Sequence, residues 1–142
     1  MDFHILSLDA AEKFVPDKPT YALRIFSSRR TYEPLPANSL YLRISEYIFD
    51  DNVGPFQAGP ISITDDIARE MVIDFAKYRD QVSALLVQCD RGINRSPAVA
   101  VALNDVFGLW YDSRALIEKF PQWNQEVYKT IKKAWERYIS HP

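Results

Sequence analysis

Cys89 and Arg95 are the residues of this 142-residue chain whose types and spacing suit chemistry. Cys89 is the only cysteine, Arg95 follows six positions later, and Gly92 lies between them. A thiolate is the nucleophilic form of cysteine, and a guanidinium can hold two oxygens of one oxyanion. This combination indicates an anion-binding loop with a nucleophile at its base, which is the arrangement that covalent phosphoryl transfer requires.

The flanking residues predict a strand before this loop and a helix after it. Residues 83–87 form a short apolar run, typical of a buried parallel strand. Residues 98–103 are all apolar, and Pro97 suits the first helical turn, where an amide has no intrahelical partner. A loop that enters a helix N-terminus gathers unpaired amides, and the helix dipole adds about half a positive charge. Such a concavity fits a phosphate group.

The pattern Cys89-x5-Arg95-Ser96, with Gly92 inside it and Pro97 behind it, resembles the signature of the cysteine-based protein tyrosine phosphatases. It is most similar to the dual-specificity-like branch, in its bacterial-type single-domain form. The resemblance implies that Cys89 attacks phosphorus, that Arg95 binds phosphate oxygens and that Ser96 helps the thiolate to leave. It also implies a phosphate-binding loop made of Asp90, Arg91, Gly92, Ile93, Asn94 and Arg95.

The same resemblance implies a general acid on a loop a few dozen residues before the cysteine. Asp50 and Asp51 lie in that place, and we expect Asp51 to protonate the leaving oxygen, with Asp50 as the alternative. Asp50-Asp51-Asn52 also suits an ordinary turn. Residues 52–60 hold two glycines and two prolines and can act as a lid that brings Phe56 or Tyr47 to a substrate ring.

Two residues depart from the family pattern. Gln88 stands where the family usually has histidine, which keeps open a phosphate-binding pseudophosphatase with little turnover. Arg91 stands where relatives more often have a small residue. It either widens the positive field or is a surface cation paired with Asp90 or another neighbour. A rhodanese-like sulfurtransferase is a further alternative, although Arg95 followed by serine fits phosphate better.

Alternating strands and helices predict an α/β fold with a mostly parallel central sheet of four or five strands flanked by helices, as in the protein tyrosine phosphatases. One domain over residues 1–142 fits the length. We expect strands over residues 3–8, 21–26 and 40–44, and a brief helix that Asp9 caps and that runs through Phe14. Further helices begin after Ser62 or Thr64, at Asp112 or Ser113, and near Trp123, and Gly108 ends the helix after the cysteine loop.

The charge and composition of the chain indicate which classes of partner to expect. A net charge of −2 disfavours nucleic acid, and the absence of a membrane span or signal-peptide pattern favours the cytoplasm and no membrane. His4 and His141 lack metal-ligand spacing, so we expect no metal or other cofactor. The expected substrate is a phosphorylated protein or a small phosphomonoester, with phosphate, sulfate or vanadate as plausible ligands. Arg29 and Arg30 either dock an acidic partner or belong to a solvated loop.

Overall fold

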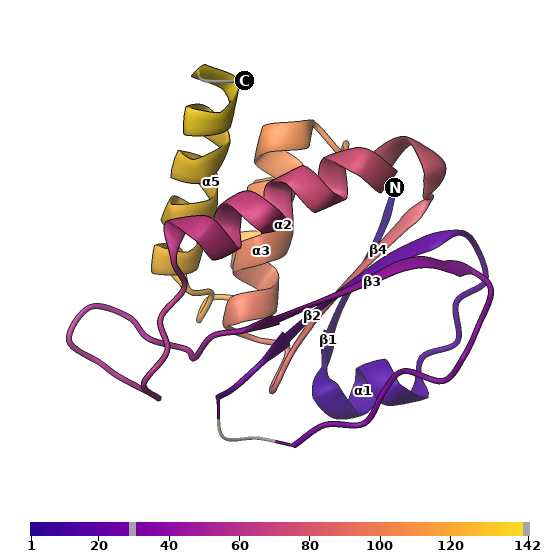
Figure 1. The fold of residues 1–142 in the computed structure, drawn as a ribbon, viewed down its shortest axis with the longest axis horizontal. Coiled ribbons are helices and arrows are strands. Elements are labelled where there is room, and N and C mark those ends of the chain that lie inside the picture. Colours follow the sequence, from indigo (N-terminus) through magenta and orange to yellow (C-terminus); the bar gives the residue numbers. More distant parts are fainter. Residues whose placement is uncertain (29–30, 141–142) are drawn as a thin grey trace.

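The computed structural model describes residues 1–28 and 31–140, and its strands form one parallel sheet (Figure 1). The strand order is β1-β4-β2-β3, and every neighbouring pair is parallel. The carboxyl ends of the four strands therefore lie at the same edge of the sheet. The predicted α/β fold with a mostly parallel sheet is confirmed, with four strands in the described residues. The strands are β1 (Asp2–Ser7), β2 (Thr20–Phe26), β3 (Tyr41–Ile48) and β4 (Ala84–Cys89).

Helices cover both faces of this sheet (Figure 1). α1 packs on β1 and β4 on one face, whereas α2 and α3 lie on the other face with α4 and α5 packed behind them. The helices are α1 (Leu8–Lys13), α2 (Asp65–Tyr78), α3 (Arg95–Phe107), α4 (Ser113–Lys119) and α5 (Gln125–Ser140), and a 3₁₀ turn, η1 (Arg79–Gln81), follows α2.

The core lies between the sheet and the helices α2, α3 and α5. The two central strands, β2 and β4, are buried along their whole length, as expected for parallel strands covered on both faces. Met71 and Phe75 of α2 and Val127 and Ile131 of α5 are buried in the same cluster. The apolar stripes of these two helices therefore face the core.

Helix caps distinguish between some of the expected boundaries. Ser7 caps α1 by accepting the Ala10 amide at 3.1 Å, so the predicted start of that helix at Asp9 is wrong, and Asp9 lies in the first turn. Thr64 caps α2 and Asp112 caps α4. Gly108 ends α3 in the left-handed conformation, with φ of 62°.

Two strands extend beyond their predicted ends. β3 continues to Ile48 rather than stopping at residue 44, because polar side chains such as Glu46 are tolerated on an edge strand with solvent beside it. β4 continues through Gln88 to Cys89, which pair in register with Leu6 and Ser7 of β1. Cys89 is thus the last residue of the strand, and the loop begins immediately after it.

Gln88 remains in a buried strand because Arg24 is its neighbour on β2. Arg24 Nε donates to Gln88 Oε1 at 2.6 Å, and Gln88 Nε2 donates to the Ile25 carbonyl at 3.0 Å. Burial lowers the pKa of Arg24, although Glu46, 3.7 Å from its guanidinium, opposes this effect. Successive strand residues face opposite sides, so the Gln88 side chain faces away from Cys89. Gln88 therefore supplies a hydrogen-bond acceptor to the buried guanidinium of Arg24.

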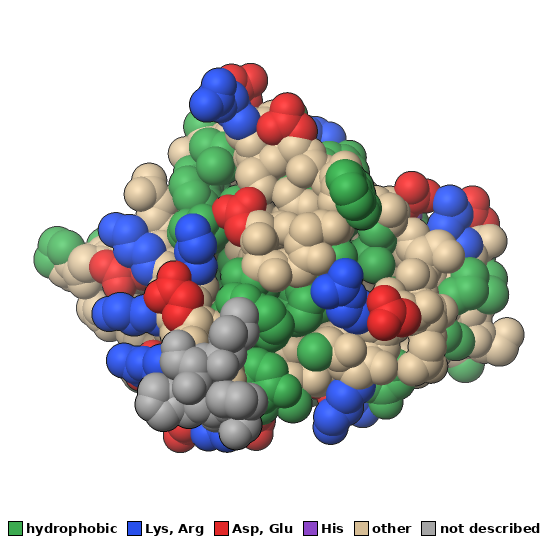
Figure 2. Space-filling view, turned by 90° about the horizontal axis from the view of Figure 1, so that it is seen from above, with side chains coloured by type: hydrophobic (Ala, Val, Ile, Leu, Met, Phe, Trp, Pro, Cys, Tyr) green, Lys and Arg blue, Asp and Glu red, His purple; other side chains and the backbone are tan. Residues whose placement is uncertain are grey.

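Within the described residues, none of the helices has the length and apolar character that crossing a membrane requires. On the face shown in Figure 2, acidic side chains are interspersed among the basic ones.

We expect Gln88→Leu to lower the free energy of unfolding by about 1.5–3 kcal/mol, because Arg24 then keeps a buried charged donor without its acceptor. Chemical denaturation measures the loss. Gln81→Leu is the matched control, since Gln81 is exposed and should change stability by less than about 0.5 kcal/mol. Adding Arg24→Met to Gln88→Leu should restore part of the loss. Equal losses in the two glutamine variants would contradict this account.

Candidate active site

The cysteine loop opens into a cleft of about 540 Å³ at the carboxyl ends of the strands. β4 ends at Cys89, residues 90–94 form the loop, and α3 begins at Arg95. Ligands of open α/β sheets bind outside the carboxyl ends of the strands, so this position suits a site. The cleft is lined by Ser27, Ser28, Asp50, Asp51, Phe56, Ala58, Gly59, Cys89, Asp90, Arg91, Asn94 and Arg95.

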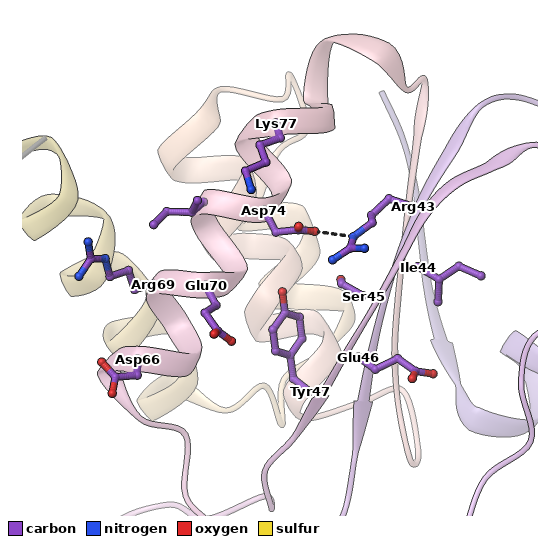
Figure 3. Close-up of a pocket in the computed structure, with 11 residues that line it drawn as sticks. Arg43, Ile44, Ser45, Glu46, Tyr47, Asp66, Arg69, Glu70, Asp74 and Lys77 are labelled. Atoms are coloured by element: carbon purple, nitrogen blue, oxygen red, sulfur yellow. Dashed lines mark hydrogen bonds and ion pairs between the residues drawn. The ribbon is translucent and has the colours of Figure 1, made fainter.

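A larger groove of about 750 Å³ runs between α2 and β3 (Figure 3). Cys89 and Arg95 do not line it, and Arg43 Nε donates across it to Asp74 at 3.0 Å. Tyr47 lines this groove rather than the cysteine cleft, so only Phe56 of the two expected aromatic residues lies at the candidate site. We therefore assign the candidate site to the smaller cleft.

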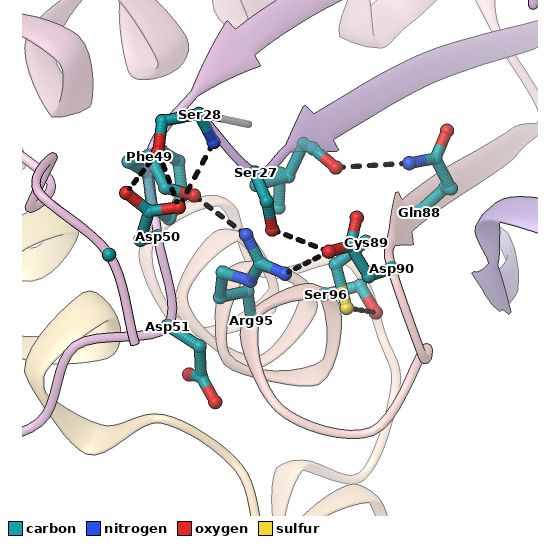
Figure 4. A network of polar contacts seen from close by, with 12 residues as sticks. Ser27, Ser28, Phe49, Asp50, Asp51, Gln88, Cys89, Asp90, Arg95 and Ser96 are labelled. Carbon is teal, nitrogen blue, oxygen red and sulfur yellow. Dashed lines mark hydrogen bonds and ion pairs between the residues drawn. The ribbon is translucent and has the colours of Figure 1, made fainter. Parts of the chain in front are cut away.

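Cys89 lines the cleft, and the buried Ser96 lies beside it (Figure 4). Cys89 is 1% exposed yet lines the cleft, and its Sγ lies 3.2 Å from the Ser96 hydroxyl. Ser96 is the second residue of α3, so the turn from strand to helix brings the two side chains together. The hydroxyl is within reach to donate a hydrogen bond to a thiolate.

The Arg95 guanidinium is held from two sides (Figure 4). Its Nη1 donates to the Phe49 carbonyl at 2.7 Å, and its Nη2 lies 3.3 Å from Asp90 Oδ2. Its Nε is buried and donates to no acceptor among the described residues. The cation is thus fixed beside the loop and keeps one buried donor for a further acceptor.

Gly92 lets the loop lie directly on β1. Its φ is +73°, and a Cβ there would lie 2.6 Å from the backbone atoms Leu6 C and Ser7 N. In the described chain, no acceptor takes the amides of residues 91–94, so these donors are available to an anion. Of the predicted loop residues, Gly92 and Ile93 do not line the cleft, whereas Asp90, Arg91, Asn94 and Arg95 do.

Asp50 is occupied by structural hydrogen bonds. Its carboxylate accepts the Ser28 amide at 3.0 Å, the Ser28 hydroxyl at 2.8 Å and the Ile61 amide at 2.9 Å. Burial raises the pKa of Asp50, but these hydrogen bonds and the charge of Arg95 outweigh burial and hold it below its usual value. Asp50 is therefore ionised at neutral pH and poorly suited to donate a proton.

Asp51 lines the cleft with fewer constraints. It is half-buried, and its Oδ1 accepts from Asn124 Nδ2 at 2.7 Å. Asn124 also caps α5, through the Val127 amide, and its own amide donates to the Asn94 carbonyl at 2.9 Å. Asn124 thereby joins the Asp51 loop to the cysteine loop.

Several of these contacts escaped the sequence analysis. Asn124 could have been recognised as a helix cap, since Asn before a helix is a cap signal, but not as a link between loops. Ser27 and Ser28 follow β2 and carried no signal. Arg29, Arg30 and His141 lie outside the described residues. Across residues 1–28 and 31–140, the structure contains no group of three or more side chains of metal-ligating type placed to hold an ion.

Arg91 is exposed and lines the cleft, whereas the Asp90 carboxylate faces Arg95 and Ser27. The contacts of the Asp90 carboxylate with Arg95 and Ser27 thus lie inside the site. The loop carries one buried cation, Arg95, and one acidic side chain directed at it.

Comparison with known proteins supports the fold. No family model matches the sequence, and no curated protein matches it. The solved structure of Tk-PTP in the active form, an archaeal protein tyrosine phosphatase, is similar at a TM-score of 0.53 and 16% identity, over 95% of this chain and 90% of that chain. A human tyrosine phosphatase-like serine/threonine/tyrosine-interacting protein gives a TM-score of 0.42 and 14% identity, over 86% and 78% of the two chains. The first similarity shows that this chain has the protein tyrosine phosphatase fold.

Gly92→Ala should destabilise the protein far more than Gly54→Ala. Both glycines have positive φ, which costs an alanine about 1 kcal/mol, but only at position 92 does a Cβ also meet backbone. Nothing lies within 4 Å of the Cβ built at Gly54, so that variant isolates the conformational cost. Thermal unfolding of both variants measures the difference. Equal melting temperatures would contradict the close packing of the loop on β1.

Proposed function

We propose that this protein hydrolyses phosphomonoesters through a phosphocysteine intermediate. The observation that carries the proposal is the single cleft in which Cys89 lies beside Ser96 and below Arg95. Arg95 Nε and the amides of residues 91–94, which have no acceptor among the described residues, add donors for an oxyanion at the N-terminus of α3. The fold, shared with a protein tyrosine phosphatase, agrees with this chemistry.

In the first step, the Cys89 thiolate attacks phosphorus in line with the leaving oxygen. The S–P bond forms while the P–O bond to the alcohol breaks, and Asp51 gives its proton to the departing oxygen. Arg95 and the loop amides hold the three equatorial oxygens, where negative charge is concentrated. Asn124 positions Asp51 for this transfer through the hydrogen bond to its Oδ1.

In the second step, water replaces the sulfur. Asp51, now a carboxylate, accepts a proton from the attacking water, and the S–P bond breaks as inorganic phosphate forms. The Ser96 hydroxyl, 3.2 Å from Sγ, stabilises the departing thiolate by donating to it. Every proton and electron pair is accounted for by these residues and water.

The substrate we favour is a phosphorylated protein, with phosphotyrosine or mixed specificity. Phe56 is 63% exposed and lines the cleft, so an aryl phosphate has an aromatic surface to contact there. The cytoplasm suits the proposal, because reducing conditions keep the single cysteine a thiol.

A phosphate-binding pseudophosphatase is the second candidate. The Asp90 contact to Arg95 favours it, since this carboxylate competes with phosphate for the cation. The rhodanese-like alternative has no comparable support, and a thiosulfate assay beside an aryl-phosphate assay separates sulfur transfer from hydrolysis.

Cys89→Ser should abolish hydrolysis of an aryl phosphate while leaving binding of vanadate or phosphate in place. The hydroxyl is a much weaker nucleophile than a thiolate, but the loop amides and Arg95 are unchanged. Steady-state turnover and calorimetric binding give the two readouts. Ser96→Ala is the companion variant, because it keeps the thiol and should slow only the second step, which a pre-steady-state burst detects. Full activity in Cys89→Ser would contradict the mechanism.

Asp51→Asn should lower kcat by about 10²–10⁴ for an ester with a poor leaving group, and less for an activated aryl ester. The reason is that protonation of the leaving oxygen matters most when the free alkoxide is unstable. Comparing the two esters in one variant separates loss of the acid from loss of folding. A uniform small effect on both esters would argue against Asp51 as the acid.

Asp50→Asn is the matched variant at the neighbouring carboxylate, and its effect should be on stability. Because the folded pKa of Asp50 is depressed, its ionised form stabilises the protein above its unfolded pKa of about 3.9, and this contribution is lost as the pH falls through the folded pKa. The variant should therefore be less stable at pH 7, with the difference shrinking below about pH 4. A stability difference that does not change with pH would contradict this role.

A further inference from the structure

Asp90 directs its carboxylate at the cation of the candidate site (Figure 4). Its Oδ2 lies 3.3 Å from Arg95 Nη2 and also accepts a hydrogen bond from the Ser27 hydroxyl. Its backbone carbonyl accepts the Leu8 amide at 3.2 Å. Hydrogen bonds thus hold the backbone of Asp90 at Leu8 and orient its carboxylate toward the guanidinium of Arg95.

The ion pair is largely removed from water. The side chains of Asp90 and Arg95 are 15% and 5% exposed, so little solvent screens their attraction. The same guanidinium is the group that the proposed function requires for phosphate. A phosphate oxygen and the Asp90 carboxylate carry like charge, and placing both on one edge of Arg95 is unfavourable.

Arg95 does not depend on Asp90 alone for its position. Its Nη1 donates to the Phe49 carbonyl at 2.7 Å, on the opposite side of the guanidinium from the carboxylate contact. The cation can therefore exchange one anion for another on Nη2 without losing its orientation. Asp90 lines the cleft, so its side chain has room to leave Arg95.

We propose that Asp90 is an internal competitor for phosphate, whose carboxylate must be displaced from Arg95 before a phosphate oxygen binds there. The inference rests on the proposed function, because that function makes phosphate the ligand. Asp90 weakens the binding of every oxyanion by the same amount, so an ester with further contacts, such as those to Phe56, is held while inorganic phosphate is released. Asp90 thus limits how tightly product phosphate is retained, whereas the preference for ester over product comes from the further contacts of the ester.

Binding of inorganic phosphate, measured by calorimetry, tests the proposal directly. Asp90→Asn should bind phosphate at least about tenfold more tightly than the unaltered protein, because one like charge beside the ligand is removed. Asp51→Asn is the matched control: it removes the same charge from the same cleft, but no contact to Arg95 is present among the described residues. Its effect should stay below about threefold.

Ser27→Ala provides a second variant that keeps the charge of Asp90. Without the hydroxyl the carboxylate is held less firmly, so phosphate should bind about two- to tenfold more tightly, which corresponds to one ordinary hydrogen bond. This variant tests the proposal even where Asp90→Asn fails to fold, which thermal unfolding reveals.

The outcomes separate this inference from hydrolysis. Tighter phosphate binding by Asp90→Asn, together with no ester turnover by the unaltered protein, would support the internal competitor and contradict the proposed hydrolysis. Unchanged or weaker phosphate binding in folded Asp90→Asn would overturn the inference, because Asp90 would then only orient Arg95. Failure of all variants to bind phosphate would overturn both proposals.

Discussion

The position of the candidate site depends on the two polar contacts of the Arg95 guanidinium. Arg95 begins α3, and it reaches the Phe49 carbonyl just after β3 and the Asp90 carboxylate just after β4. It therefore connects the carboxyl ends of two strands that are not neighbours in the sheet, since β2 lies between them. A buried cation without these acceptors would cost several kcal/mol, so the loops on either side must hold their places. The position of the cleft follows from this requirement.

Charge balance around this cation explains why three carboxylates lie near one arginine. Asp90 contacts Arg95 directly, Asp50 is close enough for its ionisation to be favoured by Arg95, and Asp51 lies in the same cleft. A binding site for a doubly charged phosphate would ordinarily contain fewer negative side chains. The Asp50 carboxylate is occupied by two amides and a hydroxyl, which leaves Asp90 as the carboxylate proposed to compete for the cation. The proposed competition for Arg95 therefore involves one carboxylate of the three, that of Asp90.

Local patterns in the sequence were sufficient to predict the strand, loop and helix around Cys89, because an apolar run, a glycine and a proline each act within a few residues. They were insufficient wherever the partner is distant. Gln88 looks like a substitution in the active site, yet its partner is Arg24, 64 residues earlier on β2. Asn124 reads as a helix cap, and its contact with Asp51 spans 73 residues. The α1 start was misplaced because serine and aspartate cap helices about equally well, and in the structure the Ser7 side chain accepts the Ala10 amide.

The neighbouring carboxylates Asp50 and Asp51 make different contacts. Asp50 is held by structural hydrogen bonds, and Asp51 is the residue proposed to act in catalysis. The amide of Asp50 donates to the Ile61 carbonyl at 2.6 Å while its carboxylate accepts the Ile61 amide, so this residue is bonded to the returning chain as if in a sheet. The chain turns at Asp51, where the Asn52 amide donates to the Asp50 carbonyl at 2.9 Å, and the side chain of Asp51 meets Asn124 instead. A residue bonded on both its backbone and its carboxylate cannot change its protonation without loss of folding energy. Among the described residues the Asp51 carboxylate accepts only from Asn124, and the proposed mechanism therefore uses the second residue of the pair as its proton donor.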